Sequence, residues 1–441
     1  MKQNERFAGL AKYEVDCLFD KIKTPAYVLD EARLIENGRI LKRIQDETGC
    51  KILLAQKAFS NFNMYKVLSP YLAGTEASGL YEARLGAEEM PEGEVHVFCG
   101  AYKDDEFDEL LKYADHIVFN SIAQLKHFGF KAKEAGKSVG IRVNPEKSTQ
   151  DGHEIYDPCA LGSRLGVTIE QWKKQMDDEL ISLLDGIHFH TLCEQDSDAL
   201  EETLEAVEKK FGSYIHNLTW VNFGGGHHIT RSDYDVDRLK KCITRIQDKY
   251  DVRVYLEPGE ACALNAGYMV TRVLDIVENN GIKIAILDSS AACHMPDVIE
   301  MPYTPPLMGA VACEDVEKLE DIEILEAIEV ENIVINKEKE IKKAIVAIGT
   351  TRNTDINQSN HIYRLGGPTC LAGDIIGDYI FENELSVGDM LIFGDMAIYT
   401  TCKNNTFNGM PLPDICVLRG NGDIDVLVSF KYEDFKERLG I

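Results

Sequence analysis

Ionisable side chains stand at or near the ends of several short apolar runs. Lys57 follows KILLA, and Glu257 follows VYL. A lysine that leaves a buried strand is partly desolvated, so its amine loses the proton more easily and can form a Schiff base. A carboxylate such as Glu257 can keep a pyridine nitrogen protonated, which makes that ring a stronger electron sink. A lysine reaching solvent from a rim and a carboxylate in a salt bridge are the simpler alternatives.

Three consecutive glycines, Gly224, Gly225 and Gly226, follow the run WVNF. Such a run exposes backbone N–H groups with no side chain in the way, which suits a phosphate. A plain glycine turn is the alternative. In the company of Lys57 and Glu257, the phosphate interpretation predicts pyridoxal phosphate as the cofactor.

Two histidines, His188 and His190, alternate with apolar residues in GIHFHT. An imidazole that faces a cofactor site can stack on a flat ring. Residues two apart in a strand point to the same face, so periodicity cannot tell which of the two histidines does so. Zinc bound by these two with His227 and His228 is the rival hypothesis. No carboxylate triad or cysteine spacing completes a ligand set, so we expect no metal.

Eight short β-rich runs alternate with amphipathic, helix-like stretches and must position these side chains. Strands that alternate with helices predict βαβ units, and eight units fit a (β/α)8 TIM barrel, whose active sites lie at the C-terminal strand ends. The eight runs are KILLA (51–55), GTEAS (74–78), VHVFCG (95–100), HIVFN (116–120), VGIRVN (139–144), GIHFHT (186–191), WVNFGG (220–225) and VYLEPG (254–259).

After about Gly267 the pattern changes to strand-like runs without intervening helices, which predicts an antiparallel β-domain of the sandwich or barrel kind. Turns are expected at Asn280-Gly281 and Asn421-Gly422. The early run TPAYVLDEARL is expected to join this β-domain. The expected strands are YMVTRVLDIVEN, KIAILDSS, DIEILEAIEV, KKAIVAIG, DMLIFGD and DIDVLVSF, and the expected division is 1–44, 45–268 for the barrel and 269–441 for the β-domain.

Composition narrows the classes of partner. Lys and Arg number 47 against 74 Asp and Glu, a net charge of −27 that disfavours nucleic acid and anionic membranes and attracts cations. The 12 cysteines form no CxxC pair, so we expect reduced thiols rather than a disulfide framework. We see no signal peptide and no membrane-length apolar run, which predicts a cytoplasmic protein.

Long stretches of the chain resemble the fold-type III pyridoxal-phosphate decarboxylases, which include the ornithine/arginine and diaminopimelate decarboxylases. The resemblance covers about residues 20–440 and is strongest to the carboxynorspermidine decarboxylase group. It implies decarboxylation of carboxynorspermidine or carboxyspermidine. The stretches that carry it are TPAYVLD, LLAQKAF, EASGLYE, LGSRLGV, GIHFHTLCE, VNFGGGHHIT, YLEPGEA, LDSSAACHMPD, GPTCLAGD and TFNGMPLPD.

The resemblance implies roles for the barrel residues. Lys57 would carry the cofactor as a Schiff base, and His190 would stack on the ring face. Glu257 would face the pyridine nitrogen, and the three glycines would hold the phosphate. Glu76 and Arg142 would support Lys57 and the ring from neighbouring strands.

It also implies roles for residues outside the barrel. Tyr399 would add its hydroxyl to the phosphate site. Cys370, in GPTC, would reach in from a second subunit to reprotonate the α-carbon, and Asp374 would accompany it and touch the substrate. Each site would therefore be shared within a homodimer.

One departure from the wider family bears on the substrate. The family commonly reads EPGR where this chain has Glu260. An anion at that place disfavours a second substrate carboxylate and favours an amine. Asp297 and Asp374 would add acidic partners, and a cationic tail gains charge-assisted hydrogen bonds from such carboxylates. We therefore expect a small, polyamine-like amino acid as the substrate.

Several alternatives remain open. Another decarboxylase of the family would act on ornithine, lysine or diaminopimelate, and a racemase would need a second acid/base on the opposite face. A non-catalytic regulator of polyamine metabolism should lose Lys57 or the glycine run, and both are present. Carboxynorspermidine and carboxyspermidine differ by one methylene, worth only about 1–3 kcal/mol in a binding site.

Overall fold

The computed structural model describes residues 6–20, 22–150, 157–314 and 361–440. The chain forms two compact units, Glu31–Leu264 and the combination of Met1–Asp30 with Asn265–Ile441. Both boundaries between the units lie earlier in the chain than the predicted ones, which followed residues 44 and 268. The first differs because helix α3 (Glu31–Thr48) packs on the barrel: Asn37 Nδ2 donates to the Leu264 carbonyl (2.9 Å) and Gln45 Nε2 donates to the Tyr71 carbonyl (2.7 Å).

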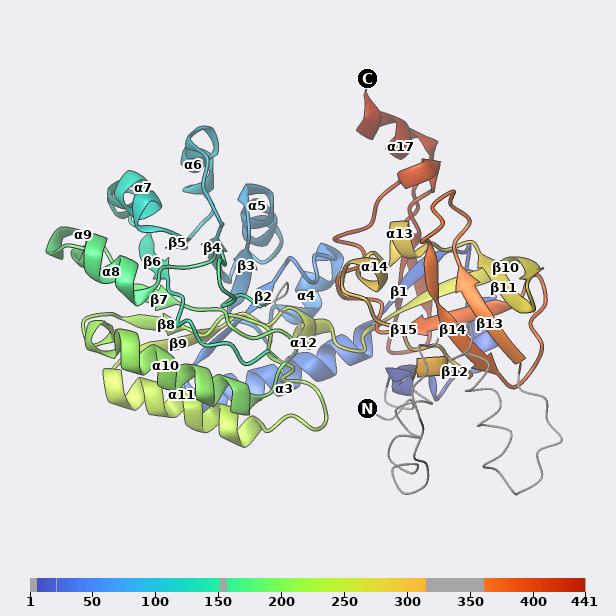
Figure 1. The fold of residues 1–441 in the computed structure, drawn as a ribbon, viewed down its shortest axis with the longest axis horizontal. Coiled ribbons are helices and arrows are strands. Elements are labelled where there is room, and N and C mark those ends of the chain that lie inside the picture. The colour runs from blue at the N-terminus through green and yellow to red at the C-terminus, as the bar shows by residue number, and fades with distance from the viewer. Residues whose placement is uncertain (1–5, 21, 151–156, 315–360, 441) are drawn as a thin grey trace, which may run out of the picture. The chain divides into compact units, whose positions relative to one another are not determined.

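The larger unit is a closed barrel of eight parallel strands in which β9 returns to pair with β2 (Figure 1). Each strand coincides with one of the eight predicted runs, so the predicted barrel is confirmed. The strands are β2 (Lys51–Ala55), β3 (Gly74–Ala77), β4 (Glu94–Phe98), β5 (His116–Phe119), β6 (Ser138–Arg142), β7 (Gly186–His188), β8 (Trp220–Asn222) and β9 (Arg253–Leu256).

Helices follow the barrel strands and cover its outer face (Figure 1). Their apolar stripes are buried, as an amphipathic helix on a sheet requires. After α3 come η2 (Phe62–Met64), α4 (Tyr65–Leu68), α5 (Leu80–Glu89), α6 (Asp104–Leu110), α7 (Ile122–Glu134), α8 (Ile169–Gln175), α9 (Asp178–Ser182), α10 (Ser197–Ile215), α11 (Val236–Tyr250) and α12 (Glu260–Ala263).

Large side chains fill the barrel interior, and glycine makes room for the largest of them. Leu53, Val118, Trp220 and Tyr255 form one buried cluster. Glycine is required opposite the indole, because a Cβ on Gly186 would lie 2.0 Å from the Trp220 ring. Close packing of this kind makes the interior a filled core with chemistry confined to its ends.

Within the described residues, the smaller unit is a nine-stranded, mostly antiparallel sheet ordered β12-β14-β13-β11-β10-β1-β16-β17, with β15 also paired to β10. The early strand β1 lies antiparallel to β10 and parallel to β16, so the predicted return of the chain into this domain is confirmed. Its strands are β1 (Ala26–Asp30), β10 (Gly267–Asn279), β11 (Ile282–Leu287), β12 (Ala310–Ala312), β13 (His361–Gly366), β14 (Ile375–Phe381), β15 (Met390–Gly394), β16 (Asp414–Leu418) and β17 (Ile424–Val428).

Both faces of this sheet are covered, which explains its continuous apolar runs. Tyr27 and Met269 lie in one buried cluster, whereas Val28 and Tyr268 lie in another. Alternate residues of a strand point to opposite faces, so a strand covered on both sides is apolar throughout.

Details of the β-domain differ from expectation. The Asn280-Gly281 turn is confirmed, with φ of 53° and 80° joining β10 to β11, and the turn at Asn421-Gly422 lies between β16 and β17. The predicted strands DIEILEAIEV and KKAIVAIG lie outside the described residues.

The absence of intervening helices was a wrong prediction. Short helices α13 (Ala291–His294) and α14 (Asp297–Glu300) follow β11, because Ser290 caps α13 by accepting a hydrogen bond from the Cys293 N–H (3.1 Å). Further helices among the described residues are η1 (Ala8–Leu10), α2 (Val15–Phe19), η4 (Phe407–Gly409) and α17 (Tyr432–Leu439). Across the described part of the chain, no helix has the length and apolarity to cross a membrane.

Candidate active site

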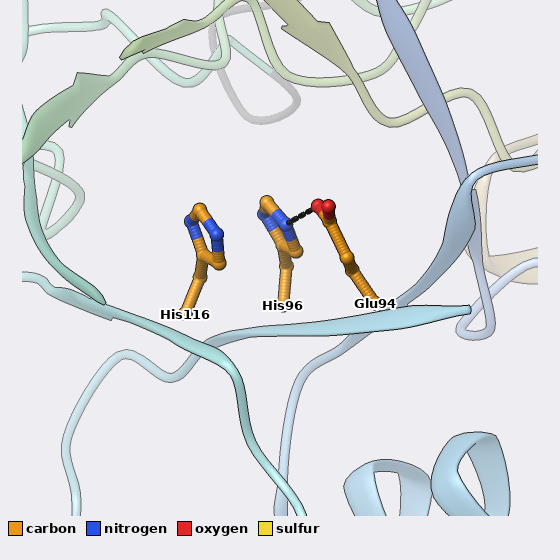
Figure 2. Close-up of side chains that lie close together, drawn as sticks. All are labelled: Glu94, His96 and His116. Atoms are coloured by element: carbon orange, nitrogen blue, oxygen red, sulfur yellow. Dashed lines mark hydrogen bonds and ion pairs between the residues drawn. The ribbon is translucent and has the colours of Figure 1, made fainter. Parts of the chain in front are cut away.

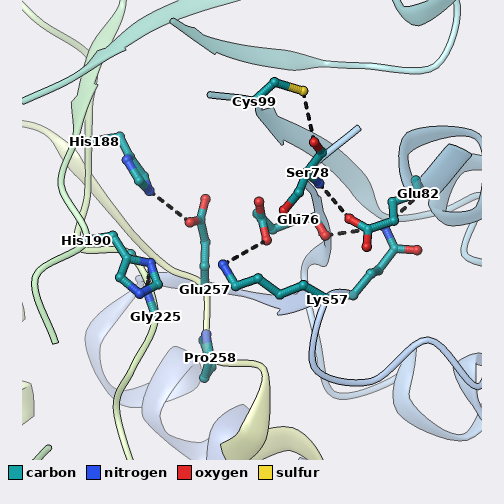
Figure 3. A network of polar contacts seen from close by, with 12 residues as sticks. Lys57, Glu76, Ser78, Glu82, Cys99, His188, His190, Gly225, Glu257 and Pro258 are labelled. Atoms are coloured by element: carbon teal, nitrogen blue, oxygen red, sulfur yellow. Dashed lines mark hydrogen bonds and ion pairs between the residues drawn. The ribbon is translucent and has the colours of Figure 1, made fainter. Parts of the chain in front are cut away.

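The C-terminal ends of the barrel strands bring five predicted side chains together (Figure 3). Lys57 follows β2, Glu76 lies in β3, His188 ends β7, His190 lies two residues beyond it and Glu257 follows β9. Parallel strands present these ends at one rim, so residues far apart in sequence meet there.

Lys57 points at Glu76, with 3.7 Å between Nζ and Oε2. Glu76 is buried, and that Oε2 atom accepts no hydrogen bond from the described residues. Burial raises the pKa of Glu76 to about 7, against the opposing charge of Lys57. A carboxyl group that titrates near neutrality beside an amine can exchange a proton with it.

Glu257 is fully enclosed and held by two donors. Asn222 Nδ2 donates to Oε1 (2.5 Å), and His188 Nε2 lies 3.0 Å from Oε2. Burial alone would raise the pKa of Glu257, but His188 and Lys57 outweigh it and lower the pKa to about 2. Glu257 is therefore a buried, ionised carboxylate. Asn222 had no predicted role, because its contact depends on side-chain direction at the end of β8.

The two histidines that periodicity left equivalent have separate environments. Burial lowers the pKa of His188 despite the opposing charge of Glu257, so a neutral His188 donates from Nε2 to that carboxylate. Its ring stacks on Phe98 with centroids 5.4 Å apart. His190 Nδ1 instead accepts a hydrogen bond from the Gly225 N–H (3.2 Å). Burial, with Lys57 and Arg142, lowers the pKa of His190 well below its usual value, so its ring is also neutral.

Arg142 supports the site from β6. Its Nη2 donates to the His190 carbonyl (3.0 Å), and its guanidinium lies 4.6 Å from the centre of the Phe98 ring. Burial lowers the pKa of Arg142 to about 10, which leaves it charged at neutral pH. Arg142 therefore fixes the backbone of His190 while adding positive charge to the rim.

The glycine loop accepts only glycine. A Cβ on Gly224 would lie 2.5 Å from the Phe189 carbonyl, and one on Gly226 would lie 2.0 Å from the Leu192 carbonyl. The two residues have φ of 71° and 80°. The Gly224 N–H donates to Asn222 Oδ1 (2.8 Å) and that of Gly225 to His190, whereas the Gly226 N–H has no partner among the described residues. The amide available to an anion is thus that of Gly226.

Glu260 already has a histidine as its neighbour. Its Oε2 lies 3.4 Å from Nε2 of His228, and both side chains are mostly buried. Burial opposes the charged imidazole, but Glu260 outweighs it and raises the pKa of His228. His228, considered earlier only as a possible zinc ligand, therefore belongs with Glu260.

The remaining predicted site residues lie in the β-domain. Asp374 is buried, and its oxygens accept hydrogen bonds from Ser290 Oγ (2.9 Å), Thr369 Oγ1 (2.6 Å) and the Ala292 N–H (3.2 Å). This pattern holds the turn between β13 and β14 in place.

Cys370 lies on that turn with an exposed side chain, and its N–H donates to Asn408 Oδ1 (3.2 Å). Asp297 forms an ion pair with Lys403. Tyr399 has a left-handed φ of 48°, and its ring centre lies 6.0 Å from Lys403 Nζ.

Known proteins identify the family. Residues 26–397 match the model of the pyridoxal-dependent decarboxylase, C-terminal sheet domain family. The carboxynorspermidine/carboxyspermidine decarboxylase of Campylobacter jejuni is 39% identical over 95% of this chain and 99% of that protein. The carboxyaminopropylagmatine decarboxylase of Synechocystis is 37% identical over 95% of this chain and 96% of that protein.

A solved structure agrees with these sequence relationships. Carboxynorspermidine decarboxylase from Campylobacter jejuni, complexed with norspermidine, superposes with a TM-score of 0.78 and 38% identity over 95% of this chain and all of that one. Diaminopimelate decarboxylase from Helicobacter pylori has a TM-score of 0.72 at 16% identity over 97% of this chain and 99% of that one, which shows a shared fold. The chain belongs to the pyridoxal-dependent decarboxylase family.

Proposed function

We propose that the chain decarboxylates carboxynorspermidine or carboxyspermidine with pyridoxal phosphate, yielding norspermidine or spermidine in polyamine biosynthesis. The observation that carries the chemistry is the buried, ionised Glu257 in the same rim as Lys57. The substrate class is supported by relatives that share 39% and 37% identity over nearly their full lengths and are named for carboxylated polyamine-like substrates.

The described residues fit pyridoxal phosphate part by part. Lys57 supplies an amine for the aldehyde, and Glu257 supplies a fixed anion for the pyridine nitrogen. The neutral His190 ring can lie against the cofactor without adding charge. The unpartnered amide of Gly226 offers a donor to the phosphate. We propose that Tyr399 adds its hydroxyl there.

These residues divide the work of the reaction. When bound, the cofactor would accept the electron pair that departing CO2 leaves behind. Glu257 would keep the pyridine nitrogen protonated, because a carboxylate of such low pKa stays ionised beside it. Lys57 would hold the cofactor through Nζ and release it to the substrate amine. Glu76, whose pKa is about 7, would exchange protons with Lys57 across 3.7 Å.

Reprotonation of the substrate carbon requires a donor, and we propose Cys370 from the second subunit of a homodimer. Its exposed side chain on the turn between β13 and β14 supports this role. Asp374 would act by holding that turn, because Ser290, Thr369 and the Ala292 amide already occupy its oxygens.

For the substrate tail we propose Glu260 and Asp297 as acidic contacts. Each already has a basic neighbour, His228 and Lys403 respectively. A cationic tail would therefore displace an existing partner at each carboxylate. Such a site favours a substrate whose ammonium group lies at the matching place over one that is attracted only by net charge.

The test is CO2 release by the purified, cofactor-loaded protein. Carboxynorspermidine, carboxyspermidine, carboxyaminopropylagmatine, meso-diaminopimelate, ornithine and lysine are supplied in parallel. We expect turnover of the first two, and their ratio of kcat/KM gives the preference. Turnover of carboxyaminopropylagmatine alone would favour the activity named for the Synechocystis relative. Turnover of diaminopimelate alone would refute the proposed role of Glu260.

A further inference from the structure

A second polar cluster lies at the opposite end of the same barrel. Glu94 is the first residue of β4, His116 is the first residue of β5 and Lys51 is the first residue of β2. These N-terminal strand ends are remote from the C-terminal ends that carry Lys57 and Glu257. Neither the predicted chemistry nor the proposed reaction uses them.

The cluster brings one carboxylate and two imidazoles together (Figure 2). Glu94 Oε2 lies 3.2 Å from His96 Nε2, and the His96 and His116 rings are stacked with centroids 3.8 Å apart. One ligand atom from each of Glu94, His96 and His116 lies within 4.8 Å of the others.

Two buried ring nitrogens in this cluster have unused lone pairs or protons. Nδ1 of His116 has no hydrogen-bond partner among the described residues. Nδ1 of His96 also lacks one, but the Nε2 atom of His96 is the one that faces Glu94. A buried polar atom without a partner is costly, and a neutral imidazole is the form that binds metals.

We propose that Glu94, His96 and His116 form a site for a divalent transition-metal ion, with Zn²⁺ as the ion tested. Two imidazoles and one carboxylate are a ligand set that zinc accepts, with water as the fourth ligand. Ligand atoms about 2.1 Å from a tetrahedral zinc lie about 3.4 Å from one another. The Glu94–His96 pair already has this spacing, so the ion replaces the proton between them. His116 completes the site by turning out of the ring stack.

Lys51 opposes the ion and so provides a specific test. The Lys51 ammonium forms an ion pair with Glu94, whose side chain is 28% exposed. Lys51 also lines a cavity of about 330 Å³ with Leu72 and Arg253, which gives the ammonium room to turn away. Removing the Lys51 charge should therefore strengthen metal binding at this site and at no other.

Titration calorimetry of the desalted, cofactor-loaded protein with Zn²⁺ tests the proposal. We expect one site per chain, weakened more than about tenfold in His116→Asn and tightened in Lys51→Gln. His127→Asn is the matched control, because His127 forms an exposed imidazole–carboxylate pair with Asp104 (2.5 Å). That variant should bind zinc like the wild type.

Co²⁺ replaces Zn²⁺ in a second measurement that reports the ligand type. We expect visible d–d bands without a thiolate charge-transfer band in the wild type, which excludes the cysteines as ligands. Circular dichroism and cofactor absorbance check that the variants are folded. Absence of binding, unchanged binding in folded His116→Asn, or a thiolate band would each overturn the proposal. If His116→Asn does not fold, weaker or unchanged binding in Lys51→Gln overturns it. None of these outcomes depends on the proposed decarboxylase substrate.

Discussion

Each end of the barrel places a carboxylate beside a histidine, but the charges around the two pairs differ. At the C-terminal end, 3.0 Å separates Glu257 Oε2 from His188 Nε2, and at the N-terminal end 3.2 Å separates Glu94 Oε2 from His96 Nε2. Glu94 also pairs with Lys51. No lysine or arginine of the described ranges lies within ion-pairing distance of Glu257, which Asn222 and His188 hold instead.

The difference separates a carboxylate whose countercharge is a lysine of the chain from one that leaves room for the positive charge of a cofactor. Burial acts to raise the pKa of both carboxyls, and their polar partners outweigh it and lower both. Glu94 has Lys51 as its countercharge, which a metal ion would displace. Glu257 has neutral hydrogen-bond donors and the more distant charge of Lys57, so it stays ionised while a positive charge brought by a cofactor can still be stabilised beside it.

Lys57→Ala should have the largest effect. It removes both the attachment point and a proton-transfer group, so we expect turnover to fall by at least about 10⁴-fold. The absorbance of the covalently held cofactor should disappear together with the activity. Full activity in the variant would refute the assignment of the C-terminal end as the reacting end.

Cys370→Ala should leave cofactor binding intact and lower turnover by about 10²–10⁴-fold, the range for one proton donor. Mixing this variant with Lys57→Ala chains tests the shared site. In a homodimer with exchanged Cys370, random mixing rebuilds one intact site in half of the dimers, about a quarter of wild-type activity. If no activity returns after subunit exchange, Cys370 acts within its own chain or does not act.

Asn222→Ala tests whether neutral donors prepare Glu257. It removes the Nδ2 donor to Glu257 and the acceptor of the Gly224 amide, and a hydrogen bond to a charged group contributes about 1.5–3 kcal/mol. We expect the Kd for pyridoxal phosphate to rise about 10- to 100-fold by fluorescence titration. Asn120→Ala, at the end of β5, removes donors to the Gly100 and Arg164 carbonyls instead, so it serves as the control and should change that Kd little.

Glu76→Gln should change stability with a defined pH dependence. The pKa of Glu76 is about 7 in the native protein against 4.5 for an ordinary glutamate, so the native state keeps its proton where the unfolded chain has lost it. Between these two values, rising pH therefore lowers the stability of the wild type. We expect the cofactor-free variant to be more stable by about 1–3 kcal/mol near pH 8 and closer to wild type near pH 5.

The thermal unfolding midpoints of the cofactor-free wild type and of cofactor-free Glu76→Gln, measured by calorimetry near pH 5 and near pH 8, provide this comparison. Equal pH slopes for the two proteins would show that Glu76 does not titrate as its burial implies.

The barrel was predictable because each of its strands is a short buried run between helix-like stretches. Their C-terminal ends then located Lys57 and Glu257 without further information. The strands β12 (AVA), β13 (HIYRLG), β14 (IIGDYIF) and β16 (DICVL) were not predicted, since each is a short run and β13 also mixes polar with apolar residues. The helical pattern of α3 begins directly after β1, so the sequence held no break to mark the domain boundary at Asp30.

Side-chain partners were not predictable to the same degree. His188 and His190 are two residues apart, so a strand pattern cannot tell them apart. Their different hydrogen-bond partners, Glu257 and Gly225, follow other strands of the barrel. The Glu94, His96 and His116 cluster was missed because two strands supply it at spacings that match no metal motif. Lys403 beside Asp297 is likewise visible only in three dimensions.

The most direct test of the central claim compares kcat for two matched variants with carboxynorspermidine. Glu257→Gln keeps the shape of the side chain and removes its charge, whereas Asp185→Asn removes the charge of a carboxylate that precedes β7 and pairs with Lys133 (2.8 Å). With cofactor occupancy verified, we expect kcat to fall about 10²- to 10³-fold in Glu257→Gln and less than about twofold in Asp185→Asn. Wild-type kcat in Glu257→Gln, or an equal loss in both, would contradict the account.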